Sequence, residues 1–152
     1  EVAVRYITAH NKWAIHSQYY DNLHMLTLGR GGQQVWMSPA DAAKIGVRDN
    51  DWVEAYNRNG IVAARANVSH RVPEGMVLMH HAQERTMNTP LTERSGRRGG
   101  THNSLTRIVL KPSHFTGGYG QFTYAFNYIG PTGNNRDEVT LIRRRTNQEV
   151  TF

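Results

Sequence analysis

The chain has 152 residues, a length that suits one domain with a single core, and its three Trp, seven Tyr and four Phe are too many aromatics for a disordered chain. A net charge of +6 and a pI of about 10.0 indicate an anionic partner, which can be a nucleic acid, a phosphate-bearing ligand or an acidic protein surface. The absence of Cys excludes disulfides, cysteine zinc sites and cysteine-ligated iron–sulfur clusters within this segment.

The first predicted elements are two strands separated by a loop that is dense in hydrogen-bond donors. The β-branched and aromatic content of Val2–Thr8 predicts a strand, and Val35–Met37 predicts a second, short one. Between them, His10–Ser17 carries two His, a Lys, a Trp and a Ser. This composition suits either a phosphate site with an indole packed on a ring or a polar loop anchored by one Trp. The apolar run Leu23–Leu28 predicts a short buried segment.

The next stretch, Ser38–Gly60, predicts a helix followed by a β-hairpin. Ser38 suits an N-cap and Asp41 suits the positive end of the helix dipole. Gly46 offers the left-handed conformation that ends many helices. Asn59-Gly60 is then a strong two-residue hairpin signal between two alternating segments.

A buried strand predicted at Met76–Met79 leads directly into two adjacent histidines, His80 and His81. Adjacent residues on a strand point to opposite faces, so we do not expect these two side chains to hold one metal ion together. No Asp, Glu or third His follows at ligand spacing, and the sequence therefore predicts no metal site here.

The remainder of the chain is less regular. Residues 84–101 form a long polar, basic and glycine-rich loop, and loops of this length tend to be functional or mobile. A short strand is predicted at Ile108–Leu110, with a break at Lys111–His114. The alternation of Phe122, Tyr124, Phe126 and Tyr128 favours one face of a strand packed on a core, although aromatics near basic residues also suit base stacking.

The last predicted strand is Val139–Ile142, and we expect Arg143–Arg145 and the tail after them to be solvated. No apolar run reaches the length of a membrane span. The start, Glu1–Val4, has neither an initiator Met nor a signal-peptide layout. We therefore expect a segment of a longer protein, with any targeting information outside it.

Long motifs in the chain carry a resemblance to a known family. The stretch SPADAAKIGVRDNDWVEAYNRNGIVAARANVSHRVPEGMVLMHH resembles the C-terminal dinucleotide-binding domain of molybdopterin oxidoreductases. The flanking motifs HNKWAIHSQYYDNLHMLTLGRGG, MHHAQERTMN, RRGGTHNSLTRI and FNYIGPTGNNRDE narrow the resemblance to the alpha subunits of respiratory, membrane-bound nitrate reductases. The resemblance implies a mainly β fold with short helices, the double-psi β-barrel. It also implies a dinucleotide-binding domain over residues 1–145 and a tail over residues 146–152.

The same resemblance implies the setting in which the domain works. The parent enzymes reduce nitrate to nitrite with electrons from quinol, at a molybdenum held by two molybdopterin guanine dinucleotides. A [4Fe-4S] cluster belongs to their N-terminal part. The implied partners are the remaining domains of the alpha subunit, an iron–sulfur beta subunit and a membrane cytochrome b gamma subunit, which place the complex on the cytoplasmic face of the membrane. We expect no catalytic residue in this segment and no activity from it alone.

Motif by motif, the resemblance places cofactor contacts in four parts of the chain. The donor-rich loop, the end of the strand at 76–79, the run after residue 101 and the last turn each supply some of them. The residues are His10, Trp13, Ile15, His16, Ser17, His81, Gln83, Asn103, Thr106 and Asn135. Arg107, Asn127 and Arg136 are second choices, since the two arginines can equally fix neighbouring turns.

Three alternatives compete with this interpretation. Within the family, a nitrite oxidoreductase alpha subunit has a closely similar domain and runs the reaction in the opposite direction. Outside it, a basic nucleic-acid-binding module would explain the charge, but the basic residues are dispersed and no recognised motif is present, so we expect no nucleic-acid partner. An autonomous decarboxylase on the same barrel would need a Gly-Ser bond for its pyruvoyl group, and the sequence has none.

Overall fold

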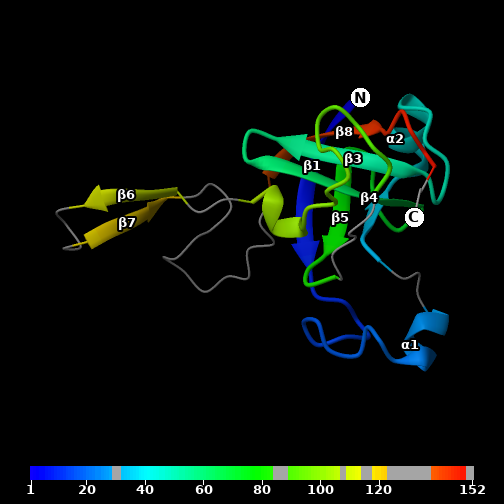
Figure 1. The fold of residues 1–152 in the computed structure, drawn as a ribbon, viewed down its shortest axis with the longest axis horizontal. Helices are drawn as coiled ribbons and strands as arrows, with labels where there is room; N and C mark the ends of the chain where they lie inside the picture. The colour runs from blue at the N-terminus through cyan, green and yellow to red at the C-terminus, as the bar shows by residue number, and fades with distance from the viewer. Residues whose placement is uncertain (29–31, 84–88, 107–108, 114–117, 123–137, 150–152) are drawn as a thin grey trace.

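The computed structural model describes residues 1–28, 32–83, 89–106, 109–113, 118–122 and 138–149. Its main body is a closed barrel in which six strands follow one another in the order β1, β5, β2, β4, β3 and β8 (Figure 1). Their bounds are Val2–Ala9 (β1), Gln34–Met37 (β2), Trp52–Asn57 (β3), Gly60–Val68 (β4), Met76–His80 (β5) and Glu138–Arg144 (β8). Closure pairs every one of these strands on both sides and leaves no free sheet edge in the barrel.

The barrel mixes parallel and antiparallel pairs. β1 runs parallel to β5, with Tyr6 opposite Val77, and β2 runs parallel to β4. The remaining four pairings are antiparallel, and one of them, between β1 and β8, places Val4 opposite Thr140. Parallel neighbours end at the same edge of a sheet, so the carboxyl ends of β1 and β5 lie side by side.

Alternating side chains of the strands fill the barrel interior. In β2, Val35 and Met37 are fully buried in the core, whereas Trp36 between them faces outward and contacts His80. Small residues on β3 and β4 leave room for the large side chains of β1, β2 and β5. The core consists of Val4, Tyr6, Val35, Met37, Ala42, Val47, Val53, Ala55, Val62, Ala64, Ala66, Val77, Met79, Leu105 and Ile142.

The predicted helix is present as α2, Pro39–Lys44, and it begins as the sequence indicates. The hydroxyl of Ser38 accepts a hydrogen bond from the amide of Asp41 at 3.0 Å, and Gly46 has the left-handed φ of +65°. Asp41 is fully buried and accepts a hydrogen bond from the amide of Gly75 at 2.7 Å, which joins the helix to the turn before β5. Burial alone raises the pKa of Asp41, but hydrogen bonds from Gly75, Ser38 and Lys44 outweigh it and the pKa is lowered.

The predicted hairpin is also present, but its loop lies one residue earlier than expected. Asn57 pairs with Gly60, so the two loop residues are Arg58 and Asn59 rather than Asn59 and Gly60. The Asn57 side chain accepts a hydrogen bond from the amide of Asn59 at 2.8 Å and stabilises the turn. Gly60 begins β4, where an added Cβ would lie 2.5 Å from the carbonyl oxygen of Ser104, so this glycine permits close approach rather than a turn.

Two predictions for short segments were wrong. Leu23–Leu28 forms the helix α1, none of whose residues is buried, so the predicted buried segment is an exposed one. The predicted break at Lys111–His114 lies partly inside a strand, because β6 runs over Val109–Ser113 and pairs with β7, Gly118–Phe122, in a separate two-stranded sheet (Figure 1). Pro112 is tolerated there, since both strands of such a sheet are edges. The predicted alternation at Tyr124, Phe126 and Tyr128 lies outside the described residues.

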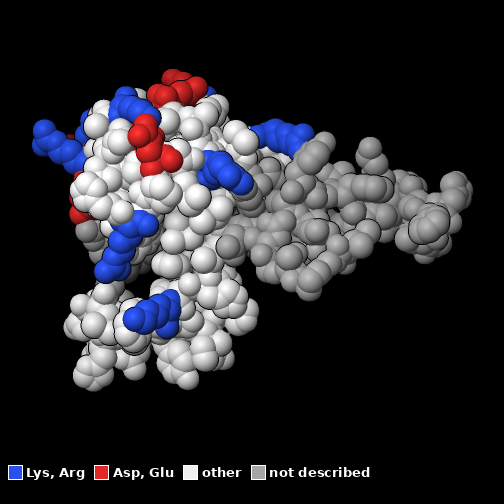
Figure 2. All heavy atoms as spheres, turned by 180° about the vertical axis from the view of Figure 1, so that it is seen from behind, with Lys and Arg blue, Asp and Glu red and all other residues white. Residues whose placement is uncertain are grey.

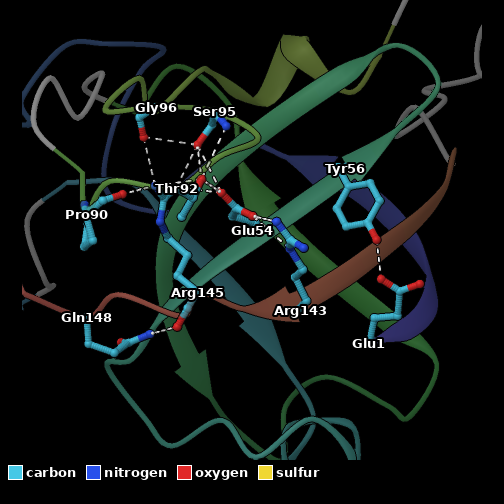
Figure 3. A network of polar contacts seen from close by, with 10 residues as sticks. All are labelled: Glu1, Glu54, Tyr56, Pro90, Thr92, Ser95, Gly96, Arg143, Arg145 and Gln148. Carbon is cyan, nitrogen blue, oxygen red and sulfur yellow. Dashed lines mark hydrogen bonds and ion pairs between the residues drawn. The ribbon is translucent and has the colours of Figure 1, made fainter.

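The prediction that Arg143–Arg145 are solvated was wrong for Arg145, whereas Arg144 is exposed as predicted and Arg143 is partly buried. Arg145 is 1% exposed, and its guanidinium lies 3.1 Å from the carboxylate of Glu54, which is fully buried on β3 (Figure 3). Arg143 donates two hydrogen bonds to the same carboxylate, at 2.9 and 2.7 Å. The tail beyond these arginines is also attached, because Gln148 hydrogen-bonds with both backbone polar groups of Trp52.

The same buried carboxylate organises the loop that includes residues 89–98. The hydroxyls of Thr92 and Ser95 donate to Glu54, and Arg145 donates to the carbonyl oxygens of Pro90 and Gly96 (Figure 3). Burial alone raises the pKa of Glu54, but the hydrogen bonds from Thr92 and Arg143 and the charge of Arg145 outweigh it and lower the pKa. This part of an irregular loop is therefore fixed to the barrel by a buried ionic network.

Candidate functional site

A group of histidines, which we call the histidine cluster, gathers at the barrel end where β1 and β5 finish together. It consists of His10, His16 and His81, with His102 at its edge. The ring centroids of His10 and His81 are 4.2 Å apart, and that of His16 lies 5.1 Å from His81. The parallel pairing explains the meeting, because Ala9 pairs with His80 and the next residue of each strand leaves the barrel at the same place.

Hydrogen bonds fix the orientation of the His81 ring and determine which of its nitrogens carries the proton. Its Nδ1 lies 3.1 Å from the carbonyl oxygen of Ala9, which can only accept, so Nδ1 carries the proton. In the neutral ring Nε2 is then an acceptor, and the Nδ1 of His16, 3.1 Å away, donates to it. With Nδ1 as the donor, the Nε2 of a neutral His16 is likewise an acceptor.

The turn that carries His16 holds the residue in a conformation that non-glycine residues seldom adopt. His16 has φ of 53°, and the turn is closed by a hydrogen bond from the amide of Gln18 to the carbonyl oxygen of Ile15 at 2.9 Å. Ala82, directly after His81, is also left-handed, with φ of 57°. Strained backbone on both sides of one contact indicates a local geometry held for function.

The edge of the histidine cluster is formed by the 3₁₀ helix η1, His102–Ser104. The ring of His102 lies 6.1 Å from that of His81, and its Nδ1 accepts a hydrogen bond from the amide of Ala82 at 3.4 Å. On the same turn the hydroxyl of Thr106 donates to the side chain of Asn103 at 3.3 Å. The turn thus presents amide, hydroxyl and imidazole groups beside the cluster.

A pocket of about 320 Å³ lies between the loop after β1 and the outer wall of β2 and β5. Trp13 and Trp36 give it aromatic walls, and Lys12 and Arg71 give it positive charge. Burial lowers the pKa of His80, whose ring stands edge-on to Trp36, so this histidine is neutral at physiological pH. The lining residues are Asn11, Lys12, Trp13, Tyr20, Leu28, Gly32, Gln34, Trp36, Arg71, Val72, Leu78, His80 and Gln83.

The structure brings most of the predicted site residues to this one end of the barrel. His10, His16 and His81 form the histidine cluster, whereas Trp13 and Gln83 line the adjacent pocket. Ile15 and Ser17 flank His16 in its turn and are exposed, and Asn103 and Thr106 lie on the turn beside His102. Asn135 and the second choices Arg107, Asn127 and Arg136 lie outside the described residues.

Sequence reasoning did not select several residues that the structure adds to the site. These are Lys12, Trp36, Arg71, His80 and His102. Trp36 had a usable signal, because it alternates with two apolar residues in a short strand and therefore faces outward. His80 and His81 do point to different sides as predicted, His80 toward Trp36 and His81 toward the cluster.

Other chemistries find less support in the part of the chain that the structure describes. No group of three or more His, Asp or Glu there has the geometry to hold a metal ion. On the face that Figure 2 shows, Lys and Arg stand apart from one another, with Asp and Glu near some of them, rather than in a continuous basic stripe. Among the described helices, none is long and apolar enough to cross a membrane.

A closed mixed barrel whose strand ends carry clustered imidazoles beside an aromatic and basic pocket has the chemistry to bind a large anionic ligand with planar rings. The chain matches the family model described as "Molydopterin dinucleotide binding domain" over residues 4–123. It belongs to this molybdopterin dinucleotide binding domain family, which confirms the predicted double-psi β-barrel and the predicted class of cofactor.

The relatives found are long polypeptides. The nitrate reductase alpha subunit of Mycobacterium tuberculosis is 65% identical over 151 residues, which are 99% of this chain and 12% of that protein. The respiratory nitrate reductase 1 alpha chain of Escherichia coli is 56% identical over 147 residues, 97% of this chain and 12% of that protein. Among solved structures, acetylene hydratase from Pelobacter acetylenicus shares the fold alone, with a TM-score of 0.57 and 10% identity over 93% of this chain and 18% of that chain.

These relatives bear on the alternatives that the sequence left open. Nitrate reductase alpha subunits match nearly the whole chain at 56–65% identity, so neither the nitrite oxidoreductase nor the nucleic-acid-binding module is favoured. The chain spans about 12% of the length of these relatives.

Proposed function

We propose that this chain is the cofactor-binding domain of a respiratory nitrate reductase alpha subunit, and that its histidine cluster and adjacent pocket hold a molybdopterin guanine dinucleotide. The observation that carries the proposal is the convergence of His10, His16 and His81, which come from segments about 70 residues apart in sequence, at the barrel end where the loop after β1 also lines an aromatic and basic pocket. The parent protein would reduce nitrate to nitrite with electrons from quinol.

The chemistry of the donor set fits this cofactor. A pyrophosphate needs N–H and O–H donors, and Ser17 and Asn103 provide them at the exposed end of the barrel, joined by His16 when its Nε2 takes up a proton from solution. A planar heterocycle needs an aromatic face and paired polar groups at its edge, and Trp13 and Gln83 provide these in the pocket. The molybdenum that the cofactor carries would supply oxygen-atom transfer in the complete enzyme.

The residues of this chain would bind and orient rather than react. His81 is locked by Ala9, and it in turn aligns His16, so the imidazoles are in place before a ligand arrives. Such preorganisation lowers the entropic cost of binding. His10, Ile15, Thr106 and Asn135 are proposed as further contacts, on the strength of the family motifs that contain them.

The setting of the domain is part of the proposal. The two nitrate reductase relatives support a place within a long alpha subunit. The N-terminal part of that subunit would carry a [4Fe-4S] cluster. An iron–sulfur beta subunit would deliver electrons, and a membrane cytochrome b gamma subunit would anchor the complex at the cytoplasmic face of the membrane. The proposal includes no nucleic-acid partner.

The test is a titration of the chain with GDP and with molybdopterin guanine dinucleotide at fixed salt, followed by amide and imidazole NMR signals. We expect saturable shifts at His16, His81 and Asn103. The variant His16→Asn, which tolerates the left-handed conformation but lacks the imidazole, should weaken binding by about tenfold or more, the effect of losing one charge-assisted hydrogen bond. The control His70→Asn changes an exposed histidine outside the site and should leave binding unchanged.

Two outcomes would contradict the proposal. One is the absence of shifts for both ligands at concentrations that saturate other guanine nucleotide sites. The other is an equal loss of binding in His16→Asn and His70→Asn, which would mean that the ligand is held by general charge and not by the histidine cluster.

A further inference from the structure

The loop and helix after β1 carry most of the large apolar side chains that the described residues leave exposed. We call residues 13–28 the apolar arm. Six of its side chains are exposed, and only Leu91 and Val139 are comparably exposed in the rest of the described chain. The six are Trp13, Ile15, Tyr19, Leu23, Leu26 and Leu28. Six exposed large apolar side chains within one short segment are more than the single exposed residues normal for a protein surface, and they point to an interaction site.

The helix in the apolar arm lacks the packing that would stabilise it. α1 has six residues and buries none of them, and Figure 1 shows it standing away from the strands of the barrel. Isolated helices shorter than about 12–15 residues are marginal in water. Local bonds shape α1, since the Asn22 side chain accepts the amide of His24 at 2.9 Å, but they bury no apolar surface. The helix therefore needs a covering surface from elsewhere.

The charge of the apolar arm indicates what kind of surface covers it. Asp21 is the one charged residue among residues 13–28, in a chain with 18 Lys and Arg. α1 has no acidic residue in its first turn and no basic residue in its last. An arm that docked on nucleic acid or an anionic lipid surface would carry basic residues, so an apolar protein surface fits better.

We propose that the apolar arm is an interdomain contact, which docks on an apolar surface of the remainder of a longer polypeptide. The inference rests on the proposed function, because relatives that match 97–99% of this chain are about eight times as long and hold their remaining residues in the same polypeptide. A covalently attached surface is present at a high effective concentration, so an apolar patch of modest size suffices to hold the contact.

Docking of the apolar arm bears directly on the cofactor site. His16 belongs to the histidine cluster and Trp13 lines the pocket, and both lie on the arm. A surface that clamps α1 also fixes these two side chains against the barrel. The remainder of the polypeptide thus completes the cofactor site by holding one of its walls in place.

The test compares amide hydrogen exchange of residues 23–28 in the 152-residue chain and in the complete alpha subunit that contains it. We expect exchange to be at least about tenfold slower in the complete subunit, since docking buries the helix. Equal exchange in the two proteins would overturn the inference. Slow exchange in the 152-residue chain would also overturn it if the chain sediments as a dimer, because a second copy would then cover the apolar arm. The same holds if slow exchange requires added phosphatidylglycerol vesicles, because a membrane would then cover the arm.

A variant pair tests the effect on the site. In the complete subunit, the double variant Leu23→Glu/Leu26→Glu should restore fast exchange of α1 and reduce the guanine nucleotide recovered per subunit after acid release at least about threefold. The control Leu91→Glu, an exposed leucine outside the apolar arm, should change neither. If no guanine nucleotide is recovered from the unaltered subunit, the proposed function fails. The interdomain contact is still supported in that case if α1 exchanges slowly in the unaltered subunit and fast in the double variant.

Discussion

Replacing Glu54 with glutamine should destabilise the barrel strongly. Glu54 is fully buried, accepts two hydrogen bonds from Arg143 and faces the buried guanidinium of Arg145 at 3.1 Å (Figure 3). The glutamine side chain would keep the shape of the glutamate but leave the charge of Arg145 uncompensated. Breaking a buried pair in this way costs about 3–5 kcal/mol of unfolding free energy. For a domain of this size that corresponds to a fall in Tm of about 6–20 °C.

The assay is urea unfolding followed by circular dichroism, with Arg144→Gln as a matched control. Arg144 neighbours the buried arginine in sequence, but its pair with Asp51, at 3.1 Å, is exposed. Loss of an exposed pair costs at most about 1 kcal/mol. The reasoning is refuted if Glu54→Gln lies within about 1 kcal/mol of the unaltered chain, or if the two variants lose equal stability.

The pH dependence of the same variant supplies a check of sign. The folded-state pKa of Glu54 is lowered from 4.5, so its contribution is fully present above that value and is lost as pH falls through the lowered folded pKa. We expect the stability of the unaltered chain to fall more steeply below pH 4.5 than that of Glu54→Gln. Asp41, whose pKa is also lowered, is present in both proteins and cancels in the comparison. Parallel curves would contradict the assigned role of Glu54.

Four further substitutions test local features by the same unfolding assay. Gly100→Ala should lower the free energy of unfolding by more than about 2 kcal/mol, because its φ is +71° and the new Cβ would lie 2.5 Å from the carbonyl oxygen of Ile61. Gly96→Ala is the control: this residue is also left-handed but lies in open space, so the loss should be about 1 kcal/mol. Equal losses in the two variants would refute the close-approach argument. Ser38→Ala should lower the free energy of unfolding by about 1–2 kcal/mol through loss of the α2 N-cap. An unchanged free energy would show that the cap is dispensable. Glu74→Gln removes an exposed pair with Lys44 and should leave the unfolding midpoint unchanged within the error of the assay.

The elements that the sequence predicted correctly are those in which local chemistry decides the conformation. The helix after Ser38 begins with a side-chain cap and ends near a left-handed glycine, and both signals lie within a few residues. The hairpin was displaced by one residue because the close approach of Ser104 to Gly60, a contact 44 positions away in the chain, determines where the glycine is needed.

The predictions that were wrong depended on partners distant in the chain. Leu23–Leu28 is apolar enough to be buried, but nothing in the described residues covers it. Arg145 has the composition of a solvated tail residue and is buried because β8 brings it to Glu54 on β3, a neighbour in the barrel but not in the sequence. No local pattern in three consecutive arginines distinguishes the buried one.

The candidate site divides in the same way. Family motifs indicated His10, His16 and His81 individually, but their meeting follows from the parallel pairing of β1 and β5, which periodicity alone does not predict. His102 joins them only through the packing of η1 beside the loop after β5. Family motifs therefore indicated candidate residues, and topology determined which of them lie together.

The pairing of β1 with β8 has a consequence for the order in which the domain is made. The strand translated first closes the barrel with the strand translated last, so closure has to wait until residues 138–144 have been synthesised. Contacts of such sequence separation also slow folding, because a long loop must be ordered before they form. A partly translated chain has β1 and β5 but no closed barrel beneath them, so a ligand that requires the finished site can be accepted only after the last strand is in place.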